Sequence, residues 1–432
     1  MPSHLDIIHG NNILDGFIPF EPEELLERDK FDETLLDIQG PYKSKSILIS
    51  GAGGSIGSEI CRQILTHSPS KLVIYEQSEL ALYKIEKELK PIAKKMSIEF
   101  VAVLASVTDQ QAISDVFESH DIEVVFHAAA YKHVPLVETN EIAGLRNNVI
   151  GTQILATQAL KSNIETFILI STDKVVRPTN IMGATKRLAE LVVQDCDIRS
   201  QKTKFSMVRF SNVLGSSGSV IPLFKDQIAK GGSVTLTHEE VTRYFMAISE
   251  AAYLVIIAGG FAQGGDVFVL DMGKPVKIKD LARRMIEISG FTIRDQYNPK
   301  GDIEIKTTGL RPGEKLYEEL LIGTETLPTS HPKILRAKET SFSSKKINSL
   351  IKEIEVAVKK NNSNQARKII SKWVERYRSP PTKIVKIIYS ITPLITSMTR
   401  SWSFMDIPLP EGRHKPVSNK FSQTAPPTIF EP

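Results

Sequence analysis

Short apolar runs alternate with segments of helical periodicity through most of the chain. The runs include SILIS, KLVIYE (71–76), IEFVAVLASV, VVFHAAA (124–130) and TFILIST (166–172), followed by MVRFSNVLGS and GGDVFVLDMG. Intervening stretches such as SELALYKIEKELKPIAKK have apolar residues at the spacing of an amphipathic helix. Continuous apolar strands that alternate with helices predict a parallel sheet with both faces covered.

The pattern therefore predicts an α/β fold, a Rossmann-type doubly wound parallel sheet over residues 46–270. A less regular insertion at about 213–246 and residues 271–335 are expected to build a smaller, C-terminal lobe that binds substrate. Residues 1–45 are predicted to be a helical lead-in. Residues 336–432 are predicted to be a basic extension, helical in part and disordered toward its end.

Charge is distributed unevenly along the chain. Lysines and arginines outnumber aspartates and glutamates by 19 to 7 in residues 331–432, whereas the preceding part holds 35 against 43. The basic extension either meets an anionic partner such as a membrane surface or is a solvated helical face. The apolar stretch 384–398 either docks on the body or lies in a membrane interface.

Composition excludes several classes of protein. The apolar content of 41% and the charged content of 24% are ordinary for a globular protein. Cys61 and Cys196 have neither a disulfide-framework nor a metal-ligand spacing, so we expect no bound metal. The chain shows no signal peptide and no membrane-spanning stretch, so we expect a cytoplasmic protein, peripheral at the inner membrane face if its extension binds lipid. We expect no nucleic-acid partner.

A glycine-rich turn, GAGGSIG, follows the first apolar run and opens the first helix. Two of its glycines allow a tight turn that approaches a pyrophosphate, and the last allows the helix to pack closely on the strand. The helix N-terminus then faces the phosphates. We therefore predict a dinucleotide site at Gly51, Gly54, Ser55, Ile56 and Gly57.

Glu76 ends the second strand, at the position where a carboxylate accepts hydrogen bonds from both ribose hydroxyls and repels a 2′-phosphate. This residue favours NAD over NADP. The small residues Ala128 and Ala129, after the fourth strand, would let the cofactor lie against the backbone. Ser106 is expected near the adenine.

The stretch STDKVVRPTNIMGATK places candidate chemistry at the carboxyl edge of the sheet, where ligands of doubly wound folds bind. Thr172, Met182 and Lys186 occupy the places of a Ser/Thr-Tyr-Lys set. Asp173 and Lys174 form an adjacent acid and amine, which suits an elimination in which a base removes one proton while an acid protonates a departing hydroxyl. A strand-end salt bridge is the alternative interpretation of the pair.

Several long motifs resemble those of one enzyme family. They are ISGAGGSIGSEI, FHAAAYKHVPLVE, NNVIGT, ISTDKVVRPTNIMGATKRLAE, VRFSNVLGSSGSVIPLF, VTRYFMAISEA, FVLDMGKPVKI and GLRPGEKLYEELL. Over roughly residues 20–340 the chain resembles the bacterial UDP-N-acetylglucosamine 4,6-dehydratases of the polysaccharide-biosynthesis (CapD-like) family, in the extended short-chain dehydrogenase/reductase superfamily. It is similar to the branch with Met in place of Tyr, and we expect it to lack the membrane helices common in that branch.

The resemblance implies conversion of UDP-N-acetylglucosamine to a UDP-4-keto-6-deoxy-hexosamine for surface glycans. It implies that Asp173 protonates the C6 hydroxyl, Lys174 removes the C5 proton, Thr172 binds the C4 oxygen and Lys186 binds the nicotinamide ribose. The substrate-binding residues that it implies are Tyr131, Lys132, His133, Asn212, Arg243, Arg311 and Glu314. A guanidinium suits a diphosphate because it donates two hydrogen bonds at once, and a structural salt bridge is the alternative for each arginine.

Met182 cannot accept the proton of the C4 hydroxyl. Tyr131, Lys186, or Asp173 acting through a water are three candidates that the sequence leaves open. It also leaves open a UDP-sugar 4-epimerase, which needs no acid/base pair at C5 and C6, and a non-catalytic NAD-binding protein. We further expect a homo-oligomer.

Overall fold

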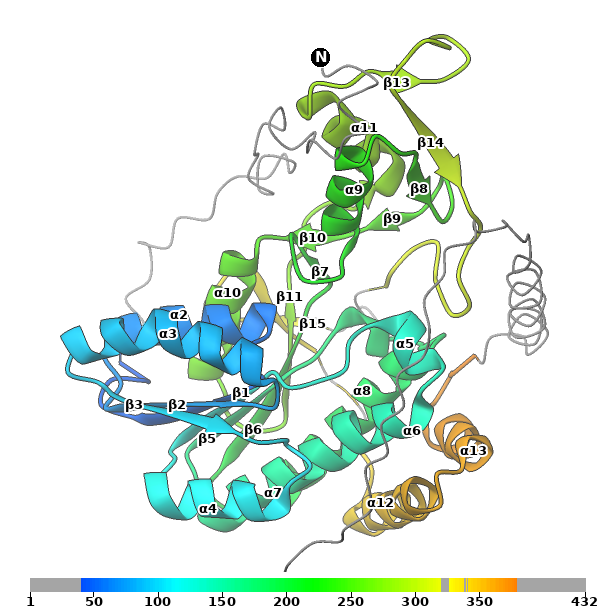
Figure 1. Cartoon of the computed structure of the whole chain (residues 1–432). Coiled ribbons are helices and arrows are strands. Elements are labelled where there is room, and N and C mark those ends of the chain that lie inside the picture. Colours follow the sequence, from blue (N-terminus) through cyan, green and yellow to red (C-terminus); the bar gives the residue numbers. More distant parts are fainter. Residues whose placement is uncertain (1–39, 320–325, 338, 340, 379–432) are drawn as a thin grey trace, which may run out of the picture. The chain divides into compact units, whose positions relative to one another are not determined.

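A nine-stranded sheet forms the centre of the computed structural model, which describes residues 40–319, 326–337, 339 and 341–378 (Figure 1). The expected lead-in helix and the stretch 384–398 lie outside these residues. The strand order is β15-β16-β11-β6-β5-β4-β1-β2-β3. The strands are β1 (Ser46–Ser50), β2 (Lys71–Glu76), β3 (Glu99–Leu104), β4 (Val124–His127), β5 (Thr166–Ile170), β6 (Lys204–Arg209), β11 (Asp266–Leu270), β15 (Thr326–Pro328) and β16 (Ile334–Ala337).

All pairs from β3 to β11 are parallel, so the predicted doubly wound α/β fold is confirmed. The chain order along the sheet reverses between β1 and β4, which creates the crevice where such folds bind ligands. The strands β16 and β15 add an antiparallel hairpin beside β11. We expected the smaller lobe to extend to residue 335, but this hairpin joins the main sheet because it satisfies the open backbone groups of β11.

Helices cover both faces of the sheet (Figure 1). Alternate strand residues such as Ile47 and Ile49 pack under α2 (Ser55–Thr66), α3 (Glu79–Lys95) and α10 (Ile248–Gly260). Leu48 and Val73 point to the opposite face, in the cluster under α4 (Gln110–His120), α7 (Gly151–Ser162) and α8 (Ile181–Arg199). Strands buried on both sides explain the continuous apolar runs of the sequence.

A second lobe has its own apolar core, made by segments on either side of β11. Its elements are β7 (Asn212–Val213), α9 (Val220–Ala229), β8 (Val234–Leu236), β9 (Thr242–Arg243), β10 (Phe245–Met246), β12 (Val276–Lys277), α11 (Ile278–Ile288), β13 (Ile293–Arg294) and β14 (Ile303–Thr307). Parallel pairing of β8 with β14 joins the two segments.

The short helices α5 (Val134–Glu138) and α6 (Glu141–Gly144), with the π-helix η4 (Leu145–Ile150), follow β4. The basic extension begins with α12 (Ser344–Lys359) and α13 (Ser363–Trp373), whose apolar faces pack in one cluster with α8 and η4. Helices with one apolar stripe bury it against a neighbour, so their lysines face outward. No helix in the described ranges is long and apolar enough to cross a membrane.

A buried ion cluster joins α8 to the sheet. The Arg209 guanidinium donates to Glu190 through Nε at 2.8 Å and Nη2 at 2.7 Å, and Glu190 also accepts from Arg187. Ser171, directly after β5, donates to Glu190 at 2.7 Å. Burial raises the pKa of Glu190, but the two arginines and Ser171 outweigh it and bring the pKa down to about 2. The cluster fixes α8 against the ends of β5 and β6.

We expect Glu190→Gln to lower the free energy of unfolding by about 3 kcal/mol, because it leaves the buried Arg209 with only one of its two carboxylate partners, Glu339. Glu86→Gln, which removes an exposed pair with Lys90, should change it by about 0.5 kcal/mol or less. The stabilisation by Glu190 is present above its ordinary pKa of 4.5 and is lost as pH falls toward 2. Urea unfolding of both variants and of the unmodified chain between pH 7 and pH 3 tests both expectations. Equal losses of unfolding free energy in Glu190→Gln and Glu86→Gln at pH 7 would contradict the role of Glu190.

Candidate functional site

Two neighbouring cavities open at the carboxyl edge of the sheet, where the strand order reverses. The smaller, of about 220 Å³, is lined by Glu76, Ala105, Asn147 and the glycine-rich turn. The larger, of about 590 Å³, is lined by Thr172, Lys174, Met182, Lys186 and Asn212, among others. Both cavities are lined by Gly51, Gly54, Ala128 and Ala130, so the glycine-rich turn lies between them.

The glycine-rich turn leaves no space for side chains. Gly51 has φ +69°, and a Cβ there would lie 2.6 Å from the Ala129 nitrogen. A Cβ on Gly57 would lie 2.0 Å from the Gly51 carbonyl oxygen. Helix α2 begins after Gly54 without a side-chain cap, so its first amides and its dipole are available to an anionic group. Ser55 and Ile56 line the larger cavity beside them.

Glu76 is held beside the turn. One carboxylate oxygen accepts from the Gly53 amide at 3.0 Å and the other from the Ser78 amide at 2.9 Å. Ser106 lies elsewhere: its hydroxyl is 2.9 Å from Thr108 Oγ1 and accepts from the Thr108 amide. Ala105 and Val107 line the smaller cavity, and Ser106 is in neither lining set. The structure therefore brings Glu76 to the cavity and turns the Ser106 hydroxyl to its own loop.

Met182 and Lys186 lie one turn apart on α8. The Asn180 side chain caps this helix by accepting from the Gly183 amide at 2.8 Å. Lys186 Nζ donates to the Ile170 carbonyl at 2.7 Å, and burial lowers its pKa to about 8 against the opposing charge of Glu190. Met182 is 3% exposed and lines the larger cavity without any group that could accept a proton.

Asp173 and Lys174 form an ion pair in the 3-10 turn η5 (Asp173–Val175), with Lys174 Nζ 3.0 Å from Asp173 Oδ1. The same oxygen accepts from the Thr172 hydroxyl at 3.0 Å. Asp173 Oδ2 is buried and has no hydrogen-bond partner among the residues that the structure describes. Thr172 and Lys174 line the larger cavity, whereas Asp173 lies behind them. Burial lowers the pKa of Lys174, but Asp173 and a second carboxylate, Glu318, outweigh it, and the net shift is upward.

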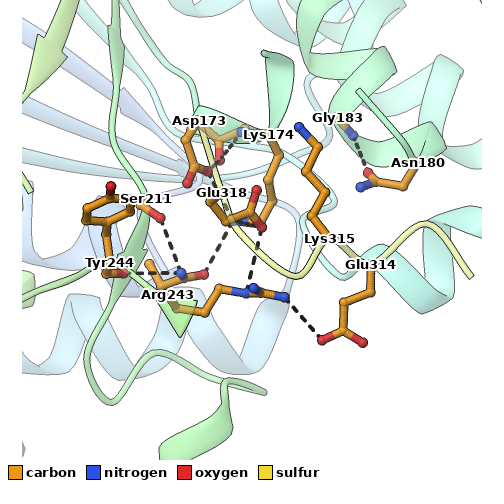
Figure 2. A network of polar contacts seen from close by, with 12 residues as sticks. Asp173, Lys174, Asn180, Gly183, Ser211, Arg243, Tyr244, Glu314, Lys315 and Glu318 are labelled. Atoms are coloured by element: carbon orange, nitrogen blue, oxygen red, sulfur yellow. Dashed lines mark hydrogen bonds and ion pairs between the residues drawn. The ribbon is translucent and has the colours of Figure 1, made fainter. Parts of the chain in front are cut away.

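Arg243 pairs with Glu314 and Glu318 of the segment 311–319 (Figure 2). Its Nη1 donates to the Thr242 and Leu316 carbonyls at 2.7 and 3.1 Å, and its Nη2 donates to Glu314 at 3.2 Å. Arg243 and Glu314 are absent from both lining sets. Arg311 is exposed, and its backbone amide donates to Glu314 at 3.1 Å. The structure thus shows Arg243 in a salt bridge rather than at a cavity wall, because the carboxylates of this segment supply its partners.

The other residues expected at the substrate do line the larger cavity. They are Tyr131, Lys132, His133 and Asn212. Asn212 accepts from Lys174 Nζ at 3.4 Å. Burial lowers the pKa of Lys132, and burial and then the Lys132 charge lower the pKa of His133.

Three further residues at the site are ones that the sequence did not single out. Asn147 lines the smaller cavity, and Asn148 accepts from the Tyr131 amide at 2.8 Å while donating to Thr185 at 3.0 Å. Both belong to the motif NNVIGT and lie on the π-helix, a distortion that often marks functional sites. Glu318 belongs to GLRPGEKLYEELL, and nothing in the spacing of that motif shows which carboxylate turns inward. The described part of the chain has no metal-binding cluster of His, Cys, Asp or Glu.

Comparisons with known proteins decide the family. Residues 47–339 match the family model described as "Polysaccharide biosynthesis protein". The chain belongs to this polysaccharide-biosynthesis family. The capsular polysaccharide biosynthesis protein CapD of Staphylococcus aureus is 46% identical over 355 residues, which are 82% of this chain and 58% of that protein. The predicted family resemblance is therefore confirmed, and the chain spans little more than half of this relative.

Two other relatives of this chain have different activities and the same sequence identity to it. A UDP-N-acetylglucosamine 4,6-dehydratase (inverting) of Campylobacter jejuni is 30% identical, over 65% of this chain and 78% of that protein. A UDP-glucose 4-epimerase of Rickettsia rickettsii is also 30% identical, over 66% of this chain and 80% of that protein. Identity alone does not separate the two reactions.

Several solved structures share the fold of this chain. Pen from Bacillus thuringiensis has a TM-score of 0.62 at 30% identity and covers 72% of this chain and 98% of its own. DesIV from Streptomyces venezuelae, a dTDP-glucose 4,6-dehydratase solved with NAD bound, has a TM-score of 0.54 at 18% identity, over 63% of this chain and 87% of its own. The second likeness shows the fold alone.

We expect Gly183→Ala to destabilise the protein by about 1–3 kcal/mol, because a Cβ at this position would lie 2.3 Å from the Lys174 carbonyl oxygen. The N-terminus of α8 would have to move away from η5. Gly232→Ala is the matched control, since its Cβ would meet nothing closer than 3.7 Å. Urea unfolding of both variants tests the contact, and equal stability would show that α8 tolerates the shift.

Proposed function

We propose that the chain is a NAD-dependent nucleotide-sugar 4,6-dehydratase that acts on UDP-N-acetylglucosamine. The observation that carries the proposal is the Asp173–Lys174 ion pair, held at 3.0 Å beside the larger cavity. An acid and an amine at the carboxyl edge of β5 supply the two proton transfers of an elimination. The Campylobacter dehydratase, at 30% identity, is one relative with this activity.

The residues around the smaller cavity fit NAD. A Cβ on Gly51 would collide with the Ala129 backbone, and a Cβ on Gly57 would collide with the Gly51 carbonyl oxygen, so both positions require the glycines of a dinucleotide-binding turn. Glu76 presents a fixed carboxylate that suits two ribose hydroxyls and opposes a 2′-phosphate. NAD, when bound there, would supply the hydride chemistry of the reaction, which is oxidation at C4 and reduction at C6.

The chain's own residues would move the protons. Lys174 and Asp173 share one proton, and its transfer from the ammonium to the carboxylate yields a neutral amine and a carboxylic acid. These are the forms that remove the C5 proton and protonate the departing C6 hydroxyl, so the pair needs no proton from solvent. Asp173 lies behind the cavity wall, and Thr172 Oγ1, 3.0 Å from Asp173 Oδ1, is the contact through which it would exchange a proton.

Lys186 is our choice among the three candidates for the C4 proton. It lines the larger cavity with Met182, and its pKa of about 8 makes a neutral amine accessible near neutral pH. Met182 would then serve as an apolar part of the wall.

A UDP-sugar 4-epimerase is the second candidate, favoured by the equal identity to the Rickettsia enzyme. It shares the cofactor and the C4 oxidation but has no use for Asp173 and Lys174 as an acid/base pair. A purely NAD-binding protein would turn over no UDP-hexose. Mass spectrometry of the product separates all three, because only a dehydratase yields a product lighter by one water.

We expect Asp173→Asn and Lys174→Ala each to lower kcat for the dehydration of UDP-N-acetylglucosamine by a factor of about a hundred or more. Met182→Leu is the control and should retain most turnover, since it conserves volume and removes no proton carrier. Mass analysis of the reaction gives the result. Normal dehydration by both Asp173→Asn and Lys174→Ala would end the assignment.

We also propose that α12 binds an anionic lipid surface. The exposed lysines Lys345, Lys352 and Lys359 recur every seven residues, which places them on one stripe of the helix, and Lys346 and Lys360 flank it. Each lysine near an anionic surface contributes about 1 kcal/mol. The homo-oligomer and the cytoplasmic location stay predictions.

Replacing the three stripe lysines by Gln should weaken the affinity of the full chain for phosphatidylserine vesicles by about a hundredfold. Sedimentation of the chain with the vesicles measures this affinity. The control replaces Lys84, Lys87 and Lys90, exposed on α3, and should leave binding close to that of the unmodified chain. Equal losses in the two variants would show that net charge alone is responsible, which would contradict a specific surface on α12.

A further inference from the structure

The carboxylate of Glu318, on the segment 311–319, faces the ion pair of Asp173 and Lys174 (Figure 2). Its side chain is 5% exposed. One oxygen, Oε1, lies 3.7 Å from Lys174 Nζ and 3.8 Å from Arg243 Nε. Glu318 therefore stands between two cations from different elements.

The segment 311–319, which carries Glu318, makes hydrogen bonds both to the Rossmann lobe and to the second lobe. Gly313 O accepts from Thr179 Oγ1 at 2.8 Å, and Lys315 Nζ donates to the Val176 carbonyl at 2.9 Å. On the side of the second lobe, the Leu316 carbonyl accepts from the Thr242 amide at 3.1 Å and from Arg243. These bonds hold the segment against the turn that contains Lys174, so the position of Glu318 is set by the fold.

The polar groups around Lys174 come from four directions, and three of them are charged. Asp173 lies on its own turn, Asn212 approaches from β7, Arg243 from β9, and Glu318 from the segment 311–319. Carboxylates favour the ammonium form and Arg243 opposes it. Because Lys174 is only 18% exposed, solvent screens these charges weakly.

We propose that Glu318 is a positioning residue that holds the Lys174 ammonium in the site and sets the proton affinity of this amine. The contact itself does not depend on the reaction, whereas its use in elimination rests on the proposed function. If Lys174 passes its proton to Asp173 during the reaction, the Glu318 charge opposes that transfer.

The chain offers a matched control for this proposal. Glu314 is on the same segment and pairs with Arg243 at 3.2 Å, but it makes no ion pair with Lys174. Comparison of Glu318→Gln with Glu314→Gln therefore separates the effect on Lys174 from a general effect on Arg243 or on the segment.

The experiment is a titration of Lys174 by NMR of the full chain labelled with 13C-lysine, with the Cε signal assigned by its loss in Lys174→Arg. Glu318→Gln should lower the midpoint by about one pH unit, the usual effect of removing a nearby opposite charge. Glu318→Asp keeps the charge at a greater distance, so its Lys174 midpoint should lie between those of the unmodified chain and of Glu318→Gln. Glu314→Gln should leave the midpoint close to that of the unmodified chain. Thermal unfolding of each variant confirms that the fold is kept, and Glu318→Asp serves if Glu318→Gln does not fold.

An unchanged midpoint in Glu318→Gln, or an equal shift in Glu314→Gln, would overturn the proposal. Assays with UDP-N-acetylglucosamine keep it distinct from the proposed function. If the unmodified chain forms no product lighter by one water while the Lys174 midpoint moves as expected, the dehydratase fails and the role of Glu318 stands. If dehydration occurs and the midpoint does not move, the dehydratase stands and Glu318 has no influence on Lys174.

Discussion

The close contact between the start of α8 and the turn after β5 is the constraint on which the site depends. Gly183 lies against the Lys174 carbonyl, where a Cβ would come within 2.3 Å of the oxygen. Lys186 Nζ donates to the Ile170 carbonyl on the other side of the same junction. Together these contacts place Thr172, Lys174, Met182 and Lys186 along one cavity wall.

Charge organises both sides of this junction. Behind it, Glu190 and Arg209 are buried and paired, so α8 is fixed by an interaction that water cannot screen. In front of it, Asp173, Lys174, Glu318, Arg243 and Glu314 form a chain of alternating charges that passes from the Rossmann lobe to the segment 311–319. An ion pair at a strand end is often structural. Here Lys174 lines the larger cavity together with Lys186 and Asn212, and this position distinguishes the pair from a surface salt bridge.

The local elements were largely predictable because short-range patterns produce them. Each apolar run became a strand of the main sheet, although VVFHAAA ends its strand at His127, and the glycine-rich turn forms a crowded junction with α2. Where individual side chains turn, and which sheet a late hairpin joins, depend on long-range packing that short-range patterns do not contain. Ser106 bonds to Thr108, Arg243 is occupied by Glu314 and backbone carbonyls, and the hairpin of β15 and β16 joined the main sheet.

By itself the sequence determined the doubly wound fold, the family and the adjacency of Asp173 to Lys174, because these follow from periodicity, motif order and covalent neighbours. Only the tertiary structure decided that Asp173 lies behind Thr172 and Lys174, that Arg243 is engaged, and that Glu318 faces the amine. These contacts join residues up to 144 positions apart, as Lys174 and Glu318 are, and their distances depend on how two lobes and a connecting segment pack. Electrostatic effects depend on such distances and on burial, neither of which a linear pattern contains.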